Sequence, residues 1–469
     1  MDFFSSVISG ISNAMYSYIL IILLIAGGLF FTFRTRFAQF RLFGEQLRAV
    51  TEKPSDGKSV SSFQALMVST ASRVGTGNII GVSTALCLGG FGSVLWMWII
   101  AIIGSASALI ESTLAQIFKK RGADGECYGG PAYYIEKGLK NRPLAVVFSI
   151  LLIITYGVGF NMLASYNLQS TFSGYSFYDE QKSPWIIGFI VAAVVCYCLI
   201  GGGKRILKIT GVMVPVMGIA YVLISLVIVV INIKNLPDVF ARIFSEAFDF
   251  EAIFGGFSGS CVMFGIKRGL FSNEAGVGSA PNASASADVS HPVKQGLVQV
   301  LSVFIDTVLI CSATAFMCMC SGVEPSEELS GAPYVQEALS SAFGGFGPIF
   351  ITVAMILFAF TTLIGNLYYV DRCWLFLFKK MPGKKFMTAY RIVSSLVIFV
   401  GAGLSAGLLW DVADVMMGLM TIINVPVIII LGKYVYRAVR NYEAQRKQGI
   451  DPVFRAKDID LPHEVDCWE

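Results

Sequence analysis

A short stretch of the chain places three glycines and two polar residues inside otherwise apolar sequence: Val74-Gly75-Thr76-Gly77-Asn78-Ile79-Ile80-Gly81. Glycine in a helix interior costs about 1 kcal/mol relative to alanine, so this pattern predicts a helix that is interrupted here. Backbone groups freed inside a membrane persist only beside protein, water or a ligand. The amides that begin the following half-helix, at its positive dipole end, suit a carboxylate. We therefore predict a binding site formed by Gly75, Thr76, Gly77 and Asn78.

These glycines allow two other interpretations. The GxGxxxG spacing is superficially similar to a phosphate-binding loop, but no βαβ pattern surrounds it. Small residues also allow two helices to pack closely, which would give the glycines a purely structural role. Thr76 and Asn78 favour binding, because they add polar groups directly beside the glycines.

The composition predicts a polytopic membrane protein. Hydrophobic residues make up 55% of the 469 residues and charged residues only 14%, against about 25% charged in soluble domains. The chain has two histidines, and most of its ten cysteines lie in apolar runs without CxxC pairs. These features leave almost nothing from which to build a histidine metal site or a serine hydrolase. We expect no enzyme activity, no organic cofactor and no nucleic-acid partner.

Eleven apolar segments are candidate membrane spans: residues 15–33, 62–88, 92–118, 146–170, 184–201, 209–233, 250–281, 296–320, 345–370, 388–408 and 411–436. Alternate connections are rich in lysine and arginine, beginning with residues 34–58, whereas the others are acidic or neutral. The positive-inside rule assigns the basic connections to the cytoplasm. We expect a multi-pass protein of a bacterial cell membrane, with the N-terminus outside and the C-terminus in the cytoplasm.

The spans divide into an inverted repeat. Residues 1–61 provide an extra N-terminal helix and a cytoplasmic loop, residues 62–233 and 250–436 hold five spans each, and residues 437–469 form a tail. Because five is odd, the two sets begin on opposite faces of the membrane. Each set opens with a glycine-rich segment, at 75–78 and at 255–259, and paired interrupted segments indicate the midplane substrate site of a secondary transporter.

Several ionisable residues lie within the predicted spans, among them Arg73, Glu111, Glu274 and Asp306. Charged groups in a membrane are costly, so these side chains are expected to face the interior of the bundle or a water-filled path. They are therefore candidates for a functional role.

Three motifs are similar to those of the alanine or glycine:cation symporter family. They are Val74-Gly75-Thr76-Gly77-Asn78, residues 268–281 (RGLFSNEAGVGSAP) and residues 291–296 (HPVKQG). The resemblance covers most of the chain. It implies a Leu-transporter-type fold, all-α with about eleven spans as an inverted five-plus-five repeat and one N-terminal helix. It also implies sodium-coupled amino-acid uptake within a lipid bilayer, and it leaves the oligomeric state open.

The first motif also resembles the unwound first core helix of neurotransmitter:sodium symporters. That resemblance implies that the amides of Gly75, Thr76 and Gly77 hold the substrate carboxylate, while Asn78 lies at an ion site. It further implies that the carbonyls of Ala71 and Val74 bind sodium.

Other site residues follow from the same resemblance. Phe257, with Ser258 and Gly259, is expected to cover the substrate, although a lipid-facing or core role is the alternative. Thr361 and Thr362 are adjacent hydroxyl residues within an apolar span, where threonine often bonds to a carbonyl one turn back. The resemblance instead implies that both are sodium ligands, and Thr362 is also expected at the substrate.

Two positions depart from the family pattern. Asn366 stands where the family commonly has tryptophan, and Ala164 lies near the place of a family glutamine. These changes predict a roomier pocket in which Asn366 contacts the substrate, so that glutamine joins alanine and glycine as a candidate. Proton coupling in place of sodium coupling, or a membrane channel, are the alternative functions.

Overall fold

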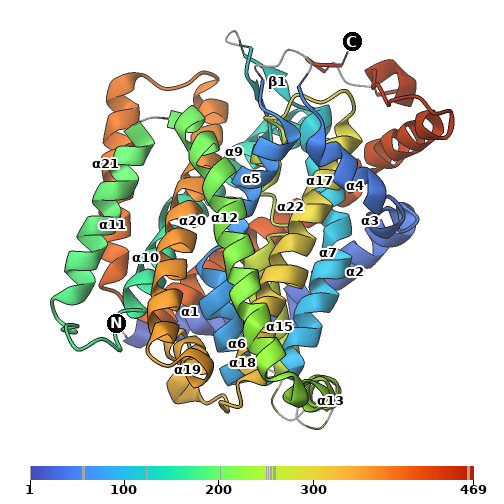
Figure 1. Ribbon diagram of the computed structural model, residues 1–469. Coiled ribbons are helices and arrows are strands. Elements are labelled where there is room, and N and C mark those ends of the chain that lie inside the picture. The colour runs from blue at the N-terminus through green and yellow to red at the C-terminus, as the bar shows by residue number, and fades with distance from the viewer. Residues whose placement is uncertain are drawn as a thin grey trace.

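The computed structural model describes residues 2–54, 59–122, 125–200, 202–249, 251, 253, 256, 260–461 and 465–468. Almost all of its regular structure is helical, as Figure 1 shows. Within these residues, nine helical segments are long and apolar enough to cross a membrane: Ser5–Arg34, Gly92–Ile117, Arg142–Ser170, Ser183–Ile200, Gly202–Ile231, Pro292–Cys320, Phe346–Phe378, Lys384–Ala402 and Ala406–Lys447. The expected polytopic all-α class is confirmed.

The helices follow the predicted order. The N-terminal region holds α1 (Asp2–Ala14), η1 (Met15–Ile19), α2 (Leu20–Arg34), α3 (Ala38–Arg41) and α4 (Phe43–Thr51). The next region, up to residue 231, holds α5 (Ser62–Arg73), η2 (Gly77–Gly81), α6 (Val82–Gly89), α7 (Gly92–Ile117), α8 (Pro131–Gly138), α9 (Arg142–Ile154), η3 (Thr155–Gly159), α10 (Phe160–Ser170), α11 (Ser183–Ile200) and α12 (Gly202–Ile231). A two-stranded antiparallel hairpin, β1 (Lys120–Arg121) and β2 (Cys127–Tyr128), follows α7.

The remaining helices form the second half of the molecule. They are η4 (Ile233–Asn235), α13 (Leu236–Ala247), α15 (Cys261–Asn273), α16 (Pro281–Ser284), α17 (Pro292–Val303), η6 (Phe304–Cys311), α18 (Ser312–Cys320), η7 (Glu327–Leu329), α19 (Ala332–Phe343), α20 (Phe346–Phe378), α21 (Lys384–Ala402), α22 (Ala406–Lys447) and η8 (Ala456–Ile459). Helices α15 and α17 pack on α7, and α12 and α20 pack on α5. The two halves are therefore interleaved around α5 and α7.

The first predicted break is confirmed. Helix α5 begins with a capping box in which the side chains of Ser61 and Gln64 bond each other's backbone amides, a strong helix start. The helix ends at Arg73, and Val74 is extended, with φ −75° and ψ 90°. Thr76 already has helical backbone angles and η2 begins at Gly77, so the chain is unwound at residues 74 and 75.

The second half contains a break that the sequence analysis did not predict. Residues 250–281 were expected to form one span, but α15 ends at Asn273 and Glu274 is left-handed, with φ 53°. Gly276 and Gly278 also have positive φ, 87° and 89°. An α-helix of L-residues cannot continue through such backbone angles, so the single-span prediction is wrong. Gly255 and residues 257–259, where the second break was predicted, lie outside the described residues.

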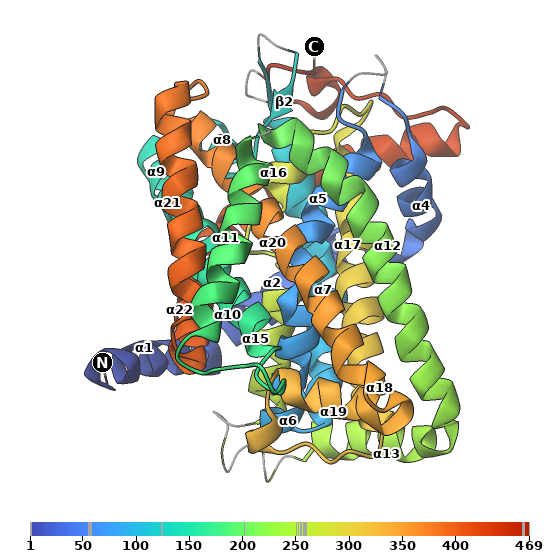
Figure 2. The ribbon, with the colours of Figure 1, turned by 60° about the vertical axis from the view of Figure 1, so that its left-hand side comes forward.

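The connections separate by charge, as predicted. The upper end of the bundle in Figures 1 and 2 carries the β1–β2 hairpin, the start of α12, the α20–α21 turn and the C-terminus, while α4 lies at the side in the upper half. The lower end carries the N-terminus, α13 and α19. Between the two ends, α12 exposes Val212, Val216 and Ile219 by 62–64%. Such a contiguous apolar face is suited to lipid.

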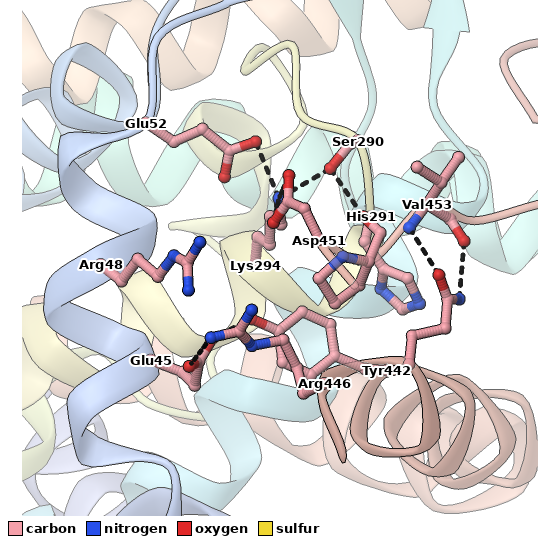
Figure 3. A network of polar contacts seen from close by, with 12 residues as sticks. Glu45, Arg48, Glu52, Ser290, His291, Lys294, Tyr442, Arg446, Asp451 and Val453 are labelled. Carbon is pink, nitrogen blue, oxygen red and sulfur yellow. Dashed lines mark hydrogen bonds and ion pairs between the residues drawn. The ribbon is translucent and has the colours of Figure 1, made fainter. Parts of the chain in front are cut away.

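A polar network fastens α4 and the C-terminal region to the start of α17 at the upper end (Figure 3). The buried amino group of Lys294 lies 2.8 Å from Glu52 and 3.2 Å from Asp451, and it donates to Ser290 over 2.7 Å. Glu45 of α4 accepts hydrogen bonds from the far end of α22. This packing accompanies the continuation of α22 to Lys447, beyond the expected end of the last span at residue 436.

Candidate substrate and cation site

A small cavity adjoins the first break. Its lining comes from α5, the break itself, η2, α10, α15 and α20: Ser72, Arg73, Gly75, Thr76, Gly77, Phe160, Ala164, Phe271 and Thr362. The cavity volume is about 10 Å³, near the lower limit for one water molecule. The structure thus brings together many of the predicted site residues. The cavity must widen before an amino acid can occupy it.

The first break is packed so tightly that neither Gly75 nor Gly77 leaves room for a side chain. A Cβ atom at Gly75 would overlap the hydroxyl oxygen of Thr362, and one at Gly77 would lie 2.8 Å from the ring of Phe271. The Gly75 amide donates to Asn78 Oδ1 over 2.8 Å. Gly77 begins a helical segment, so its amide has no acceptor within that helix. The glycines therefore let the backbone itself form one wall of the cavity.

The predicted sodium ligands are only partly brought together. Thr362 Oγ1 donates over 3.2 Å to the carbonyl of Ala71, which lies in the last turn of α5 before the extended Val74. Thr361, in contrast, bonds to the carbonyls of Leu357 and Phe358 on its own helix, each at 3.0 Å. The structure thus joins Ala71 and Thr362 across two helices. Thr361 adopts the self-bonded arrangement that was weighed against a ligand role.

Asn78 is part of a buried oxygen-rich cluster. Its side-chain nitrogen donates to Asp306 Oδ1 over 2.7 Å and to Ser272 Oγ over 3.1 Å. Ser272 and Thr307 both donate to Asp306 Oδ2, at 2.6 and 2.7 Å. Asp306 is fully buried, and no lysine or arginine in the described part of the chain forms an ion pair with it. Burying an unpaired carboxylate is costly, so this site favours a bound cation or a proton.

Arg73 brings a positive charge to the cavity. Its side chain is buried and donates to Gln299 Oε1 over 3.0 Å. The Nε and Nη2 atoms have no hydrogen-bond partner among the described residues. From the sequence, Arg73 and Asp306 were predicted to face the bundle interior or a water-filled path and were candidates for a functional role, but they were not assigned to this site. Their membership in the site required knowledge of the packing.

Asn366 does not line the cavity in this conformation. It is fully buried, donates to Asn161 Oδ1 over 3.0 Å and accepts from Ser72 Oγ over 2.7 Å. Ser72 Oγ also lies 3.1 Å from Glu274 Oε1, so this hydroxyl joins the two breaks. Asn366 therefore links α5, α10 and α20 beside the cavity. Ala164, the other departure from the family pattern, does line the cavity.

Aromatic side chains close the cavity on one side. The ring of Phe271 lies 4.7 Å from that of Phe160 and 4.9 Å from that of Trp410. Trp410 also lines a separate groove of about 470 Å³. An ion pair of 3.3 Å between Arg268 and Asp414 holds Trp410 beneath the guanidinium. Phe271 thus separates the groove from the cavity. Phe257, Ser258 and Gly259, which were predicted to cover the substrate, lie outside the described residues.

A membrane-spanning helical bundle in which an interrupted helix lines a closed cavity has the architecture of a secondary active transporter. The unwound backbone, a carbonyl bonded to a threonine hydroxyl and a buried carboxylate provide groups for an organic anion and for cations. No covalent step is needed for such a protein to work.

Comparison with known proteins establishes the family. The chain belongs to the Sodium:alanine symporter family, whose model matches residues 1–456. It is 44% identical to the amino-acid carrier protein AlsT of Bacillus subtilis, over 100% of this chain and 98% of that protein. It is 43% identical to the probable sodium/glutamine symporter GlnT of Bacillus subtilis, over 98% and 95% of the two chains. With the sodium/alanine symporter AgcS of Methanococcus maripaludis it shares 35% identity, over 95% and 99%.

The fold also matches a solved transporter structure. The crystal structure of MhsT in complex with L-phenylalanine superimposes with a TM-score of 0.59 and 15% identity, covering 87% of this chain and 96% of that one. The predicted family and the Leu-transporter-type fold are thereby confirmed. The protein is a multi-pass, cation-coupled amino-acid carrier and not an enzyme.

Proposed function

We propose that this protein takes up a small neutral amino acid together with sodium by alternating access. The observation that carries the proposal is the arrangement around Gly75, whose bare backbone packs against Thr362 while Thr362 bonds to the carbonyl of Ala71. A cation placed between that hydroxyl and carbonyl would lie beside the unwound backbone. Unwound carbonyls at a helix break are typical ligands for coupling sodium ions.

The substrate is proposed to bind in the cavity after it widens. The amides of Thr76 and Gly77 and the guanidinium of Arg73 would hold the carboxylate, because donors at a helix start and a buried positive charge both favour an anion. Phe271 would cover the substrate, and Ala164 would face its side chain. Alanine, glycine and glutamine are the candidate substrates, since the named relatives include an alanine symporter and a probable glutamine symporter.

Asp306 supports proton coupling as a second candidate function. Its carboxylate has three hydrogen-bond donors and no ion-pair partner in the part of the chain that the structure describes. Either a second sodium ion or a proton would neutralise it. The Ala71–Thr362 site contains neutral oxygens only, so it has no group that could carry a transported proton.

We propose that the basic end of the bundle is cytoplasmic and that the N-terminus lies outside. The carrier would reside in the cell membrane of a bacterium. The concentration of the basic connections at one end of the molecule supports this orientation, because such connections are retained on the cytoplasmic side.

Uptake into proteoliposomes tests the coupling. Labelled alanine, glycine and glutamine are offered with an inward sodium gradient, and separately with a proton gradient in sodium-free buffer. We expect saturable uptake of at least one of them that requires sodium. Uptake driven by the proton gradient alone, and lost in Asp306→Asn, would favour proton coupling. Flux that does not saturate would favour a channel.

A further inference from the structure

Two cysteines from distant parts of the chain meet at the basic end of the bundle. Cys127 belongs to β2 of the hairpin that follows α7, and Cys467 lies near the C-terminus. Both are free thiols. The residues on either side of Cys467, Asp466 and Trp468, contact residues next to the hairpin, and Cys467 lies close enough to Cys127 to influence its pKa. Neither cysteine takes part in the substrate or cation site.

The surroundings of Cys127 favour its thiolate. The neighbouring Cys467 thiol and the positive charges of Lys119 and Arg121 lower the pKa of Cys127 below that of an ordinary thiol, against the opposing effects of burial and of Asp288. The thiolate is the form of cysteine that attacks a disulfide. The pair therefore combines a nucleophile with a second thiol at its side.

The C-terminal residues are seated firmly over this pair. The indole nitrogen of Trp468 donates to the carbonyl of Gln116 over 2.8 Å, and Lys119 Nζ lies 4.8 Å from the centre of the Trp468 ring. Asp466 forms an ion pair of 2.7 Å with Lys137. Cys127 is only 5% exposed under this cover, whereas Cys467 is half-buried. A thiol-reactive reagent therefore reaches Cys127 mainly when the C-terminal tail dissociates from these contacts.

Hydrogen bonds of Gln116 connect this contact site of the tail to the region after the second break. Gln116, which accepts the Trp468 bond, donates through its side-chain nitrogen to the carbonyls of Ser284 and Ala287, at 2.6 and 3.0 Å. Ser284 ends α16, the short helix that follows the non-helical segment 274–280, and Ala287 lies just beyond it. The tail extends from α22 at the end of the second predicted repeat, while the hairpin belongs to the first. A covalent bond between the tail and the hairpin would join the two repeats.

We propose that Cys127 and Cys467 form a reversible disulfide that fastens the C-terminal tail to the β1–β2 hairpin and slows transport under oxidising conditions. The regulatory part rests on the proposed function, because only a carrier whose repeats move against each other is slowed by such a bond. Disulfides on a cytoplasmic face are usually transient and redox-sensing, which fits a pair that is normally reduced.

A small-molecule disulfide, such as that of an oxidised low-molecular-weight thiol, supplies the oxidant. The Cys127 thiolate attacks one of its sulfurs, which breaks the S–S bond, releases one thiolate and leaves a mixed disulfide on Cys127. When the tail returns to its seat, the Cys467 thiol gives up its proton to the released thiolate. The Cys467 sulfur then attacks Cys127 Sγ and expels the second small thiol. Two protein thiols are oxidised and one small disulfide is reduced.

The experiment uses the full-length protein in proteoliposomes, treated with oxidised glutathione and then with dithiothreitol. Peptide mapping without reduction should show an intramolecular bond between the peptides of Cys127 and Cys467. Amino-acid uptake should fall several-fold with formation of this bond and recover on reduction. Cys467→Ser should transport like the reduced wild type and keep its activity in oxidised glutathione. Cys87→Ser, which changes a half-buried cysteine elsewhere, should remain as sensitive as the wild type.

Two results would overturn the proposal. One is the absence of the Cys127–Cys467 peptide at oxidant concentrations that modify other cysteines. The other is complete bond formation with unchanged uptake. Mapping needs no transport, so it tests the disulfide even if the reduced carrier proves inactive. Inactivity of the reduced protein would refute the proposed function instead.

Discussion

The two helix breaks of this carrier differ in what holds them open. At the first break, residues 74 and 75 are unwound without a positive φ, and the glycines allow the backbone to meet Thr362 and Phe271. At the second, three residues with positive φ turn the chain, and Glu274 is held by Ser72 and Ser279. Gly75 borders the cavity, whereas Gly276 and Gly278 are packed among helices.

This difference separates a break that binds from a break that shapes the fold. A backbone wall beside a cavity can approach a ligand only if it carries no side chain. A left-handed turn in the protein interior needs glycine for conformational reasons, whether or not a ligand is present. Substitutions at the first break should therefore act on transport, and those at the second break should act on stability.

The largest effect is expected from Gly75→Ala. The new methyl group would overlap Thr362 Oγ1, displacing both the cavity wall and the proposed cation ligand. Uptake by the purified protein should fall by a factor of about 100 or more, which corresponds to about 2.7 kcal/mol. Gly81→Ala is the matched control, because its methyl group would meet neighbours only at 3.6 Å and beyond. Equal uptake by the two variants would remove the functional role of the first break.

Gly278→Ala should chiefly destabilise the fold. Its φ is +89°, and its methyl group would lie 2.8 Å from Phe148 and 3.0 Å from Asn424. The left-handed conformation alone costs roughly 1–2 kcal/mol for a residue with a Cβ. Thermal unfolding in detergent should therefore occur at a lower temperature, with the half-saturating sodium concentration of the surviving protein unchanged.

Gly276→Ala provides a control for the overlap at Gly278. It has a similar φ of +87°, but the nearest atom to its methyl group would be 3.4 Å away. It should be destabilised less than Gly278→Ala. A marked change of sodium dependence in either variant would show that the second break also takes part in ion binding.

Thr362→Val should weaken the proposed cation site. The change preserves the shape of the side chain and removes the oxygen that lies 3.2 Å from the carbonyl of Ala71. The sodium concentration for half-maximal uptake should rise about tenfold, equivalent to about 1.4 kcal/mol. Thr361→Val should leave it nearly unchanged, since that hydroxyl bonds to its own helix. The opposite ranking would mean that Thr361 turns toward the ion when sodium binds.

The smallest effect is expected from Ser72→Ala, at the point where the two breaks touch. Its hydroxyl lies 2.7 Å from Asn366 and 3.1 Å from Glu274. Losing one buried hydrogen bond should lower the free energy of unfolding by about 1 kcal/mol, with uptake changed only slightly. Denaturation and transport assays on one preparation would show this. If uptake were abolished in a stable protein, the two breaks would have to be treated as one functional unit.

The sequence predicted the first break because its signal is local. Gly75 and Gly77 stand in a long apolar run, and their helix propensity alone identifies the interruption. The second break carries a weaker signal. Gly276 and Gly278 are separated by Val277 and follow a charged residue. The second break was predicted at residues 255–259 because glycine is denser there. That the chain turns at residues 274–278 depends on packing that no local pattern records, and the segment 255–259 lies largely outside the described residues.

The site itself could be predicted only in outline. Thr361 and Thr362 are adjacent, and consecutive residues of a helix point about 100° apart. Their order along the chain does not tell which one faces Ala71. Asn78 and Asp306 are separated by 228 residues, so their hydrogen bond follows from the tertiary fold alone. The prediction that Asn366 contacts the substrate depended on the residue type, whereas its position beside Asn161 and Ser72 depends on three packed helices.

The length of α22 has a mechanical consequence. A helix of 42 residues is about 63 Å long, roughly twice the thickness of the hydrocarbon core of a bilayer. Its outer part extends beyond this thickness to the polar network at the upper end, where Tyr442 and Arg446 contact Glu45 of α4, and it ends where the C-terminal tail begins. A tilt of the buried part that releases these contacts displaces the end of the helix in proportion to its length. A spectroscopic probe at the end of α22 would report, with amplified distance changes, rearrangements that are small at the cavity.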